Sequence, residues 1–504
     1  MASNKPNILF LMTDQQRFDT IGKLGNLNIS TPNFDRLVER GVTFTNAYSP
    51  CPVCVPARLI IRTGRSSLNT ACWDNYGVFP VAAQSPHVEE NCGRYLPKVM
   101  SNLGYRTFGI GKFHPPQGET DIGYDTYLQS TEADGEVNEY ADYIYHNYPA
   151  YRHIEQLHGE RTDMYYQPQT SPLPADLTVE AWAADQAIKM MNVHDDRPWF
   201  GFVSFIGPHP PFAPPIPYNR MYDPDAMPLP VSGDPKTDHM DERIPWNNYY
   251  VYAEDVSPRQ WQTLKARYYG EISYIDSCIG RILDDIEARE EDDNTLICFF
   301  SDHGELMGDH NAVQKEGFFE GSAHISFLLS WPQRLPKDVK NPSLASLTDL
   351  FAIATTAAGK CELRDGVDLL AVAEGSGEGR EHLIGYASPP GDRNFRLMVR
   401  KGPWKYNFHA NGGGEQLFNI PSDPNELQNL ADKENEVKMD LRAIAIAELS
   451  SHPAGRPALC DGELLVFPRQ VLETERCRQF SWPRGITDFP ATPEEVKEPL
   501  PYGQ

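Results

Sequence analysis

The sequence lacks a long hydrophobic run and has few positive charges. No stretch of about 18 apolar residues occurs, so we expect no membrane span. No apolar signal segment precedes the first strand-like run, which predicts a cytoplasmic protein, or a periplasmic or secreted one if a signal segment has been removed. The chain has 45 Lys and Arg against 70 Asp and Glu, a net charge of −25 over 504 residues. Nucleic acids require clustered cations, so we expect no nucleic acid as a partner. Because we expect no membrane span, we expect no membrane partner either.

Cysteine is also scarce, and the nine cysteines are an odd number scattered through the chain. This distribution does not indicate a disulfide framework. A chain of this length buries roughly three quarters of its surface and does not need disulfides for stability. Cys51 and Cys54 form a Cys-x-x-Cys pair, but no second pair with matching spacing completes a zinc site. A mostly reduced chain is therefore expected.

Short apolar runs alternate with helical segments over the first two thirds of the chain. The apolar runs lie at 7–12, 105–111, 199–205 and 295–300. Each is typical of a buried parallel strand. Helices are expected after Thr31-Pro32, at 175–194 and at 258–287, where apolar residues recur every three or four positions. The alternation predicts an α/β fold with a large, mostly parallel sheet sandwiched by helices.

The last third of the chain has a different pattern. Paired strands are expected at 395–399 and 404–408, with a continuation at 415–420 and a helix starting at Pro424. These elements predict a smaller antiparallel sheet with a packed helix, and Lys401 and Lys405 are expected at the surface of its hairpin. We therefore expect three parts: a catalytic domain, a C-terminal α+β subdomain and a Pro-rich arm that favours a homo-oligomer. Their predicted bounds are 1–375, 376–454 and 455–504.

Polar residues follow each of the four apolar runs. They are Asp14, then Lys112 and His114, then His209, and finally Asp302 and His303. The carboxyl ends of parallel strands meet at one edge of a sheet, which is where α/β proteins bind ligands. The sequence therefore predicts one functional site at this edge.

A second signal is Cys54-Val55-Pro56-Ala57-Arg58, followed by Thr63-Gly64-Arg65. Pro56 suits the first turn of a helix that begins near Cys54. A helix N-terminus offers N–H groups to an oxyanion, and Arg58 lies one turn further on the same face. This segment resembles the Cys-x-Pro-x-Arg signature of the type I sulfatases of the alkaline phosphatase superfamily. The resemblance extends to the segments 6–15, 31–37, 111–114, 301–305 and 400–429, with Phe113 in place of a Trp.

The resemblance implies an alkaline-phosphatase-like fold and hydrolysis of sulfate esters. In that family a separate maturation enzyme oxidises the signature Cys to formylglycine, and the hydrated aldehyde is the nucleophile, which would place this group at Cys54. Arg58, Lys112 and Lys315 would neutralise charge on the transferring group. His209 would protonate the leaving oxygen, and His114 would take the remaining hydroxyl proton. Asn75 is a weaker candidate for a polar contact with the diol, and Glu320 and His324 are weaker still.

The resemblance also implies one divalent metal ion. Its ligands would be Asp14, Gln15, Asp302, His303 and the modified Cys54. Gln15 and His303 stand where many sulfatases have Asp and Asn, so this site is less anionic. Oxygen ligands favour Ca²⁺, while the added imidazole leaves Mn²⁺ and Mg²⁺ open.

The expected substrate is a sulfated carbohydrate or other sulfated small molecule such as an aryl sulfate. A phosphonate monoester or phosphodiester hydrolase is the alternative, because such enzymes also carry Cys-x-Pro-x-Arg. The Lys112 and His114 pair favours the sulfatase, and the complete polar set opposes a non-catalytic glycan-binding relative. Loop aromatics are expected to form either a sugar-binding cleft or loop packing. They include Tyr76, Tyr145, Tyr148, Tyr165, Tyr166, Trp246 and Tyr249.

Overall fold

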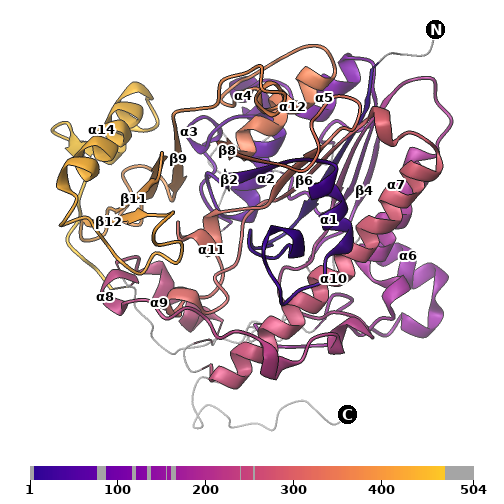
Figure 1. Ribbon diagram of the computed structural model, residues 1–504, viewed down its shortest axis with the longest axis horizontal. Coiled ribbons are helices and arrows are strands. Elements are labelled where there is room, and N and C mark those ends of the chain that lie inside the picture. The colour runs from indigo at the N-terminus through magenta and orange to yellow at the C-terminus, as the bar shows by residue number, and fades with distance from the viewer. Residues whose placement is uncertain are drawn as a thin grey trace, which may run out of the picture.

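An eight-stranded sheet forms the centre of the molecule (Figure 1), in the order β4-β3-β5-β1-β6-β7-β2-β8. The computed structural model describes residues 5–75, 87–115, 121–132, 138–154, 156–159, 166–238, 240–251, 253 and 256–471. The strands are β1 Asn7–Thr13, β2 Gly41–Tyr48, β3 Arg106–Gly111, β4 Thr126–Gln129, β5 Trp199–Ser204, β6 Thr295–Ser301, β7 Phe327–Ser330 and β8 Val339–Ser346. Neighbouring strands are parallel, except that β7 runs antiparallel to β6 and β2. The predicted fold class is confirmed.

Helices cover both faces of this sheet because successive side chains of a buried strand point to opposite faces. On β1, Leu9 and Leu11 pack with helices α1, α7 and α10, whereas Ile8 and Phe10 pack with α2, α5 and α12. These helices are α1 Pro32–Glu39, α2 Cys54–Thr63, α5 Leu96–Asn102, α7 Val179–Met191, α10 Pro258–Ala288 and α12 Leu350–Ala357. An unbroken apolar strand is therefore what this position in the sheet requires.

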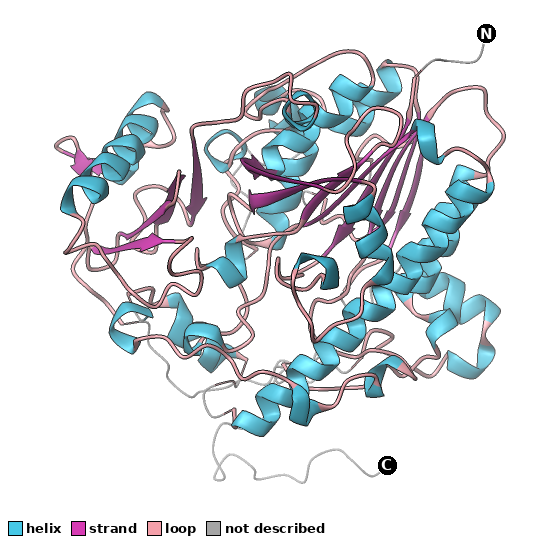
Figure 2. Cartoon of the chain, viewed as in Figure 1, coloured by secondary structure: helices cyan, strands magenta, loops and turns pink. Residues whose placement is uncertain are grey.

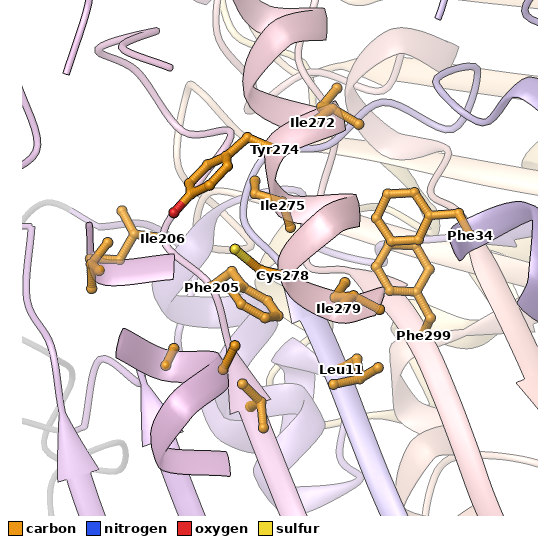
Figure 3. Close-up of a cluster of buried hydrophobic side chains, with 14 of the residues drawn as sticks. Leu11, Phe34, Phe205, Ile206, Ile272, Tyr274, Ile275, Cys278, Ile279 and Phe299 are labelled. Carbon is orange, nitrogen blue, oxygen red and sulfur yellow. The ribbon is translucent and has the colours of Figure 1, made fainter. Parts of the chain in front are cut away.

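The long helix α10 illustrates how the sequence builds one of these layers. Ser257 and Gln260 form a capping box at its start, and Pro258 occupies the first turn. Its apolar stripe then lies on the sheet, and Figure 3 shows Ile279 beside the rings of Phe34 and Phe299. None of the described helices is both long and apolar enough to cross a membrane.

Shorter helices connect these layers. They are α3 Ser67–Thr70, α4 His87–Cys92, α6 Glu139–Asn147, α8 Pro235–Asp238, α9 Arg243–Tyr250, α11 Glu320–Ala323 and α13 Leu369–Ala373. Of these, α9 and α11 lie near the carboxyl edge of the sheet and next to the C-terminal part of the chain (Figure 1).

A second, four-stranded antiparallel sheet lies beside the first (Figure 2), in the order β12-β11-β10-β9. Its strands are β9 His382–Ala387, β10 Arg396–Lys401, β11 Trp404–His409 and β12 Gly414–Asn419, and α14 Asn435–Ser451 packs on it through Leu441, Ala445 and Leu449. A two-stranded pair follows, β13 Leu459–Cys460 and β14 Glu463–Leu464. Residues 472–504 of the predicted arm lie outside the described residues.

The expectation that a helix starts at Pro424 is wrong. The Asp423 carboxylate accepts hydrogen bonds from the backbone N–H groups of Leu427 and Gln428, at 3.1 and 2.8 Å, which closes a turn. Glu426 within this turn has φ of +53°, which a helix does not allow. The packed helix therefore begins later, at Asn435.

Candidate active site

Cys54 stands at the first position of α2, beyond the carboxyl ends of β1 and β6. Val53 is extended and Cys54 is helical, so the chain turns into the helix at this residue. Its Sγ lies 3.1 Å from His303 Nε2, 3.0 Å from Lys315 Nζ and 3.7 Å from Asp14 Oδ1. Cys54 is 1% exposed. The ends of β1 and β6, the loop that carries Lys315 and the start of α2 therefore meet at this sulfur atom.

The surroundings of Cys54 favour an anion. Burial and Asp14 raise the pKa of the Cys54 thiol, but Lys315, Lys112 and His303 outweigh them and lower it to about 7. Asn75 supports the same helix end, because its Oδ1 accepts a hydrogen bond from the Val55 N–H at 2.9 Å. A negatively charged or strongly polarised group at position 54 is stabilised here.

Two aspartates are held in place by Arg58. Its Nη2 donates to Asp14 Oδ2 at 2.8 Å, and its Nε donates to Asp302 Oδ2 at 3.0 Å. These contacts occupy one oxygen of each carboxylate, while Asp14 Oδ1 lies toward Cys54 and Asp302 Oδ1 lies 3.6 Å from His303 Nε2. Burial raises the pKa of Asp14, but Lys112 and Arg58 outweigh it, so the pKa is well below its usual range. Asp14 is therefore ionised.

His303 completes a set of four potential metal ligands. Its Nδ1 donates to the Gly304 carbonyl oxygen at 3.0 Å. Burial lowers the pKa of His303, but Asp302 and Cys54 outweigh it and raise the pKa, so a metal ion would bind Nε2 in exchange for a proton. One ligand atom from each of Asp14, Cys54, Asp302 and His303 lies within 4.8 Å of the others, and all four residues are buried. The donors suit a divalent cation, because two carboxylates supply the charge and the imidazole supplies a neutral nitrogen.

Gln15 lies next to this set, with φ of +65°. Its backbone N–H donates to Asp302 Oδ1 at 3.1 Å, and its Oε1 accepts a hydrogen bond from Lys315 Nζ at 2.7 Å. Its Nε2 donates to Glu305. The amide oxygen thus orients Lys315 toward Cys54, and the role of Gln15 as a metal ligand stays a prediction.

Lys112, His114 and His209 lie on the other side of Cys54. Lys112 is 1% exposed, and its Nζ contacts the Asp14 carboxylate. The Nδ1 of His209 donates to the Pro210 carbonyl oxygen at 2.7 Å, so Nε2 is the atom left to exchange a proton. Burial, Lys112, Arg58 and Lys315 all lower the pKa of His114, despite the opposing effect of Asp14, so His114 is neutral at pH 7.

Glu132 is a site residue that the sequence reasoning missed. Its carboxylate contacts Lys112 and lies 3.5 Å from both His114 Nε2 and His209 Nε2. It follows β4, a fifth strand that ends at the same edge of the sheet. β4 consists of four half-buried residues, so no apolar run predicted it. Only the recognition of β4 as a strand would have led to Glu132.

These groups surround a cavity of about 250 Å³. It is lined by Cys54, Val55, Asn75, His114, Glu132, His209, Asn247, Tyr250, Val251, Gln314, Lys315 and Glu316. Trp246 stacks on Tyr250 with ring centroids 5.1 Å apart, and Glu316 Oε2 lies 3.0 Å from Arg243 Nη2. The cavity is therefore basic near Cys54 and has an aromatic and acidic wall further away.

Among the described loop aromatics, Tyr145, Tyr148 and Tyr166 do not line this cavity. Tyr166 is buried, and its hydroxyl donates to Glu305 Oε1 at 2.9 Å. Tyr145 and Tyr148 pack against the core on the α10 side of the sheet. Tyr76 and Tyr165 lie outside the described residues. Packing is therefore the better interpretation for Tyr166, Tyr145 and Tyr148.

The expectation that Lys405 lies at the surface is wrong. Lys405 is fully buried, and its Nζ lies 2.7 Å from Glu320 Oε1 and 2.6 Å from Glu426 Oε1. His324 Nδ1 lies 2.7 Å from Glu320 Oε2, so this weak site candidate belongs to the same network and lies away from Cys54. In β11 the apolar residues face α14, and Lys405 on the opposite face is covered by Glu320 of α11 rather than by solvent. Lys401 does lie at the surface, paired with Glu381 at 2.7 Å.

Comparisons with known proteins agree with this arrangement. An arylsulfatase of Clostridium perfringens is 29% identical over 479 residues, which cover 90% of this chain and 96% of the relative. A choline-sulfatase of Rhizobium meliloti is 28% identical over 465 residues, covering 86% of this chain and 83% of the relative.

Solved structures share the fold. A phosphonate monoester hydrolase of Agrobacterium radiobacter superposes with a TM-score of 0.75 at 23% identity, covering 89% of this chain and 96% of that one. A 2-O GAG sulfatase gives a TM-score of 0.67 at 19% identity, covering 91% and 94% of the two chains. The Sulfatase family model matches residues 6–360, more than half of the chain. The chain therefore belongs to the sulfatase family of sulfuric ester hydrolases.

Proposed function

We propose that this sulfatase hydrolyses the sulfate monoester of a carbohydrate or aryl alcohol, with an oxidised Cys54 as its nucleophile. The observation that carries the proposal is the position of Cys54. Its sulfur lies at the start of α2, beside the cavity and within 3.1 Å of both Lys315 Nζ and His303 Nε2. A nucleophile at this place is activated by the same cations that would bind the sulfate.

The proposed nucleophile requires maturation of Cys54 to formylglycine by a separate enzyme. One hydroxyl of the hydrated aldehyde loses its proton to solvent, and the resulting oxyanion attacks sulfur while the electron pair of the breaking S–O bond stays on the leaving oxygen. His209 Nε2 then gives that oxygen its proton. The remaining hydroxyl loses its proton to His114, so the sulfated diol collapses to the aldehyde and releases sulfate. An unmodified Ser or Cys would instead leave a stable ester that water must cleave.

The proposed cofactor is one divalent metal ion, with Ca²⁺ the first choice and Mn²⁺ or Mg²⁺ the alternatives. Asp14, Asp302, His303 and residue 54 would hold it, with Gln15 as a fifth candidate. When bound, it would polarise the nucleophile and the ester oxygens. Arg58 orients both carboxylates, and Lys112 and Arg58 keep Asp14 ionised.

Metal binding is expected to stabilise the folded protein. Treating the holoenzyme with EDTA should lower its free energy of unfolding by about 3 kcal/mol, the value for a ligand present at a few hundred times its Kd. Thermal unfolding after adding back Ca²⁺, Mn²⁺ or Mg²⁺ separately should identify the metal by the largest rise in Tm. If none of the three raises Tm and elemental analysis finds no bound metal, the proposed site is wrong.

The ester class is tested by a direct comparison of rates. The purified protein should hydrolyse 4-nitrophenyl sulfate with a larger kcat/KM than 4-nitrophenyl phenylphosphonate, because both release the same phenol and differ in the transferring group. The phosphonate is the matched competitor, since phosphonate monoester hydrolases share this fold. A larger kcat/KM for the phosphonate would reverse the assignment.

A further inference from the structure

Glu132 brings a carboxylate into a cavity that is otherwise basic around Cys54. Its side chain is 10% exposed. One oxygen contacts Lys112 Nζ and lies 3.5 Å from His114 Nε2, and the other lies 3.5 Å from His209 Nε2. Lys112 pairs with this carboxylate, but a negative charge that faces the incoming sulfate still opposes its binding, so the position of Glu132 calls for a compensating role.

That role follows from a requirement of general acid catalysis: the imidazole must carry a proton even though cations surround it. An imidazole can donate a proton to the leaving oxygen only if it is protonated when the substrate is bound. Lys112, Arg58 and Lys315 surround this part of the site, and together with burial they lower the pKa of neighbouring His114. His209 lies close enough to Asp14 for the two to interact, so it is exposed to the same cations. In such surroundings a nearby anion favours the charged form of an imidazole.

The geometry of His209 directs its second proton toward Glu132. The Nδ1 hydrogen is taken by the Pro210 carbonyl oxygen at 2.7 Å. The second proton must therefore be on Nε2, which faces the Glu132 carboxylate at 3.5 Å and lines the cavity. An ion pair at this distance favours the charged imidazolium.

Within the part of the chain that the structure describes, the other acidic groups near His209 do not replace Glu132. Asp14 is committed to Arg58 and Lys112. Glu180 on α7 and Glu271 on α10 lie behind the turn that carries His209. Burial raises the pKa of both, and Glu180 Oε1 already accepts a hydrogen bond from the Gly207 N–H at 3.2 Å. Glu316, across the cavity, is paired with Arg243, and His158 on the other side of the turn is not an anion.

We propose that Glu132 is a positioning residue that keeps the proton on His209 Nε2 until the S–O bond breaks. This inference rests on the proposed sulfate ester hydrolysis. The electron pair of the S–O bond goes to the leaving oxygen, which takes the His209 proton, and the imidazole is left neutral. A proton from water restores the imidazolium beside Glu132 before the next turnover.

The test combines three variants of the holoenzyme with a series of sulfate esters whose leaving groups differ in pKa. Glu132→Gln should lower kcat/KM by about 10²-fold for an unactivated phenyl or alkyl sulfate, which needs its leaving oxygen protonated. It should change the rate for 4-nitrophenyl sulfate little. The alkaline limb of the pH profile should move to lower pH, and Glu132→Asp should restore part of the effect. Glu316→Gln removes a carboxylate from the same cavity and should keep the wild-type leaving-group dependence.

A second readout does not depend on turnover. The pKa of the His209 imidazole, followed by NMR and assigned with His209→Gln, should be lower in Glu132→Gln than in the wild type. Equal pKa values in the two proteins would overturn the inference, even if no sulfate ester were hydrolysed. A loss of rate that is the same for every leaving group, or a gain in rate with a lower KM, would also overturn it. A wild type that cleaves no sulfate ester would refute the proposed function separately.

Discussion

Replacing Cys54 by Ala is expected to lower kcat/KM for 4-nitrophenyl sulfate by about 10⁴-fold or more, because enzymes that lose their nucleophile keep little beyond electrostatic binding. The fold should survive, since Cys54 contributes a small side chain at a helix start and Arg58 still ties Asp14 to Asp302. The measurement is the initial rate, with thermal unfolding as the control for folding.

Cys54→Ser separates the proposed mechanism from an ordinary nucleophile. A hydroxyl in the same place should attack once and leave a sulfated serine that turns over slowly. Intact-protein mass spectrometry should then find one added sulfo group. In the active wild type, the peptide 51–58 should carry an aldehyde in place of the thiol. An active wild type with an unmodified thiol would contradict the mechanism.

Replacing Lys405 by Met is expected to have the largest effect on stability. The change leaves Glu320 and Glu426 buried without their shared cation, and breaking a buried ion pair from one side costs about 3–5 kcal/mol. Urea unfolding should show this loss. The matched control is Lys401→Met in the same hairpin, which removes only a solvent-exposed pair with Glu381 and should cost far less stability. Equal losses in the two variants would show that Lys405 does not stabilise the fold through its buried pairs with Glu320 and Glu426.

The stability loss in Lys405→Met should also depend on pH. Burial already raises the pKa of Glu426 in the wild type, even though Lys405 lowers it. Without Lys405, the folded-state pKa of Glu426 should rise further above its unfolded value, and the pKa of Glu320 should rise from the low value that Lys405 and His324 maintain. Groups of this kind add stability as the pH falls toward and below the folded-state pKa, because protonation removes the uncompensated charge. The deficit should therefore be smaller at pH 5 than at pH 8.

The sequence contained enough to predict the sheet and the convergence of Asp14, Cys54, Lys112, His209 and Asp302. Apolar runs predict parallel strands, and parallel strands place their carboxyl ends together. The spacing of Cys54 and Arg58 places both on one face of a helix whatever surrounds it. These inferences depend on the geometry of single strands and helices, which the local sequence determines.

What could not be predicted depends on contacts between distant segments. The alternation in β11 shows that Lys405 faces away from Trp404 and Tyr406, but it does not show that α11 covers that face. Glu132 follows a strand of half-buried residues whose place at the sheet edge comes from pairing with β3. The turn after Asp423 was mistaken for a helix start, because an Asp before a Pro predicts both.

The burial of Cys54 has a consequence for the biosynthesis of the protein. Residue 54 is enclosed by Asp302, His303 and Lys315, which are translated long after it. The chain between positions 54 and 303 is 303 − 54 = 249 residues long, and at ribosomal rates of roughly 5–20 residues per second it takes roughly 12–50 s to make. The proposed maturation enzyme must reach the thiol in that interval or on a chain that has not yet closed. The time between synthesis of residue 54 and closure of the fold around it therefore limits the fraction of chains in which Cys54 is matured. Faster folding would lower that fraction.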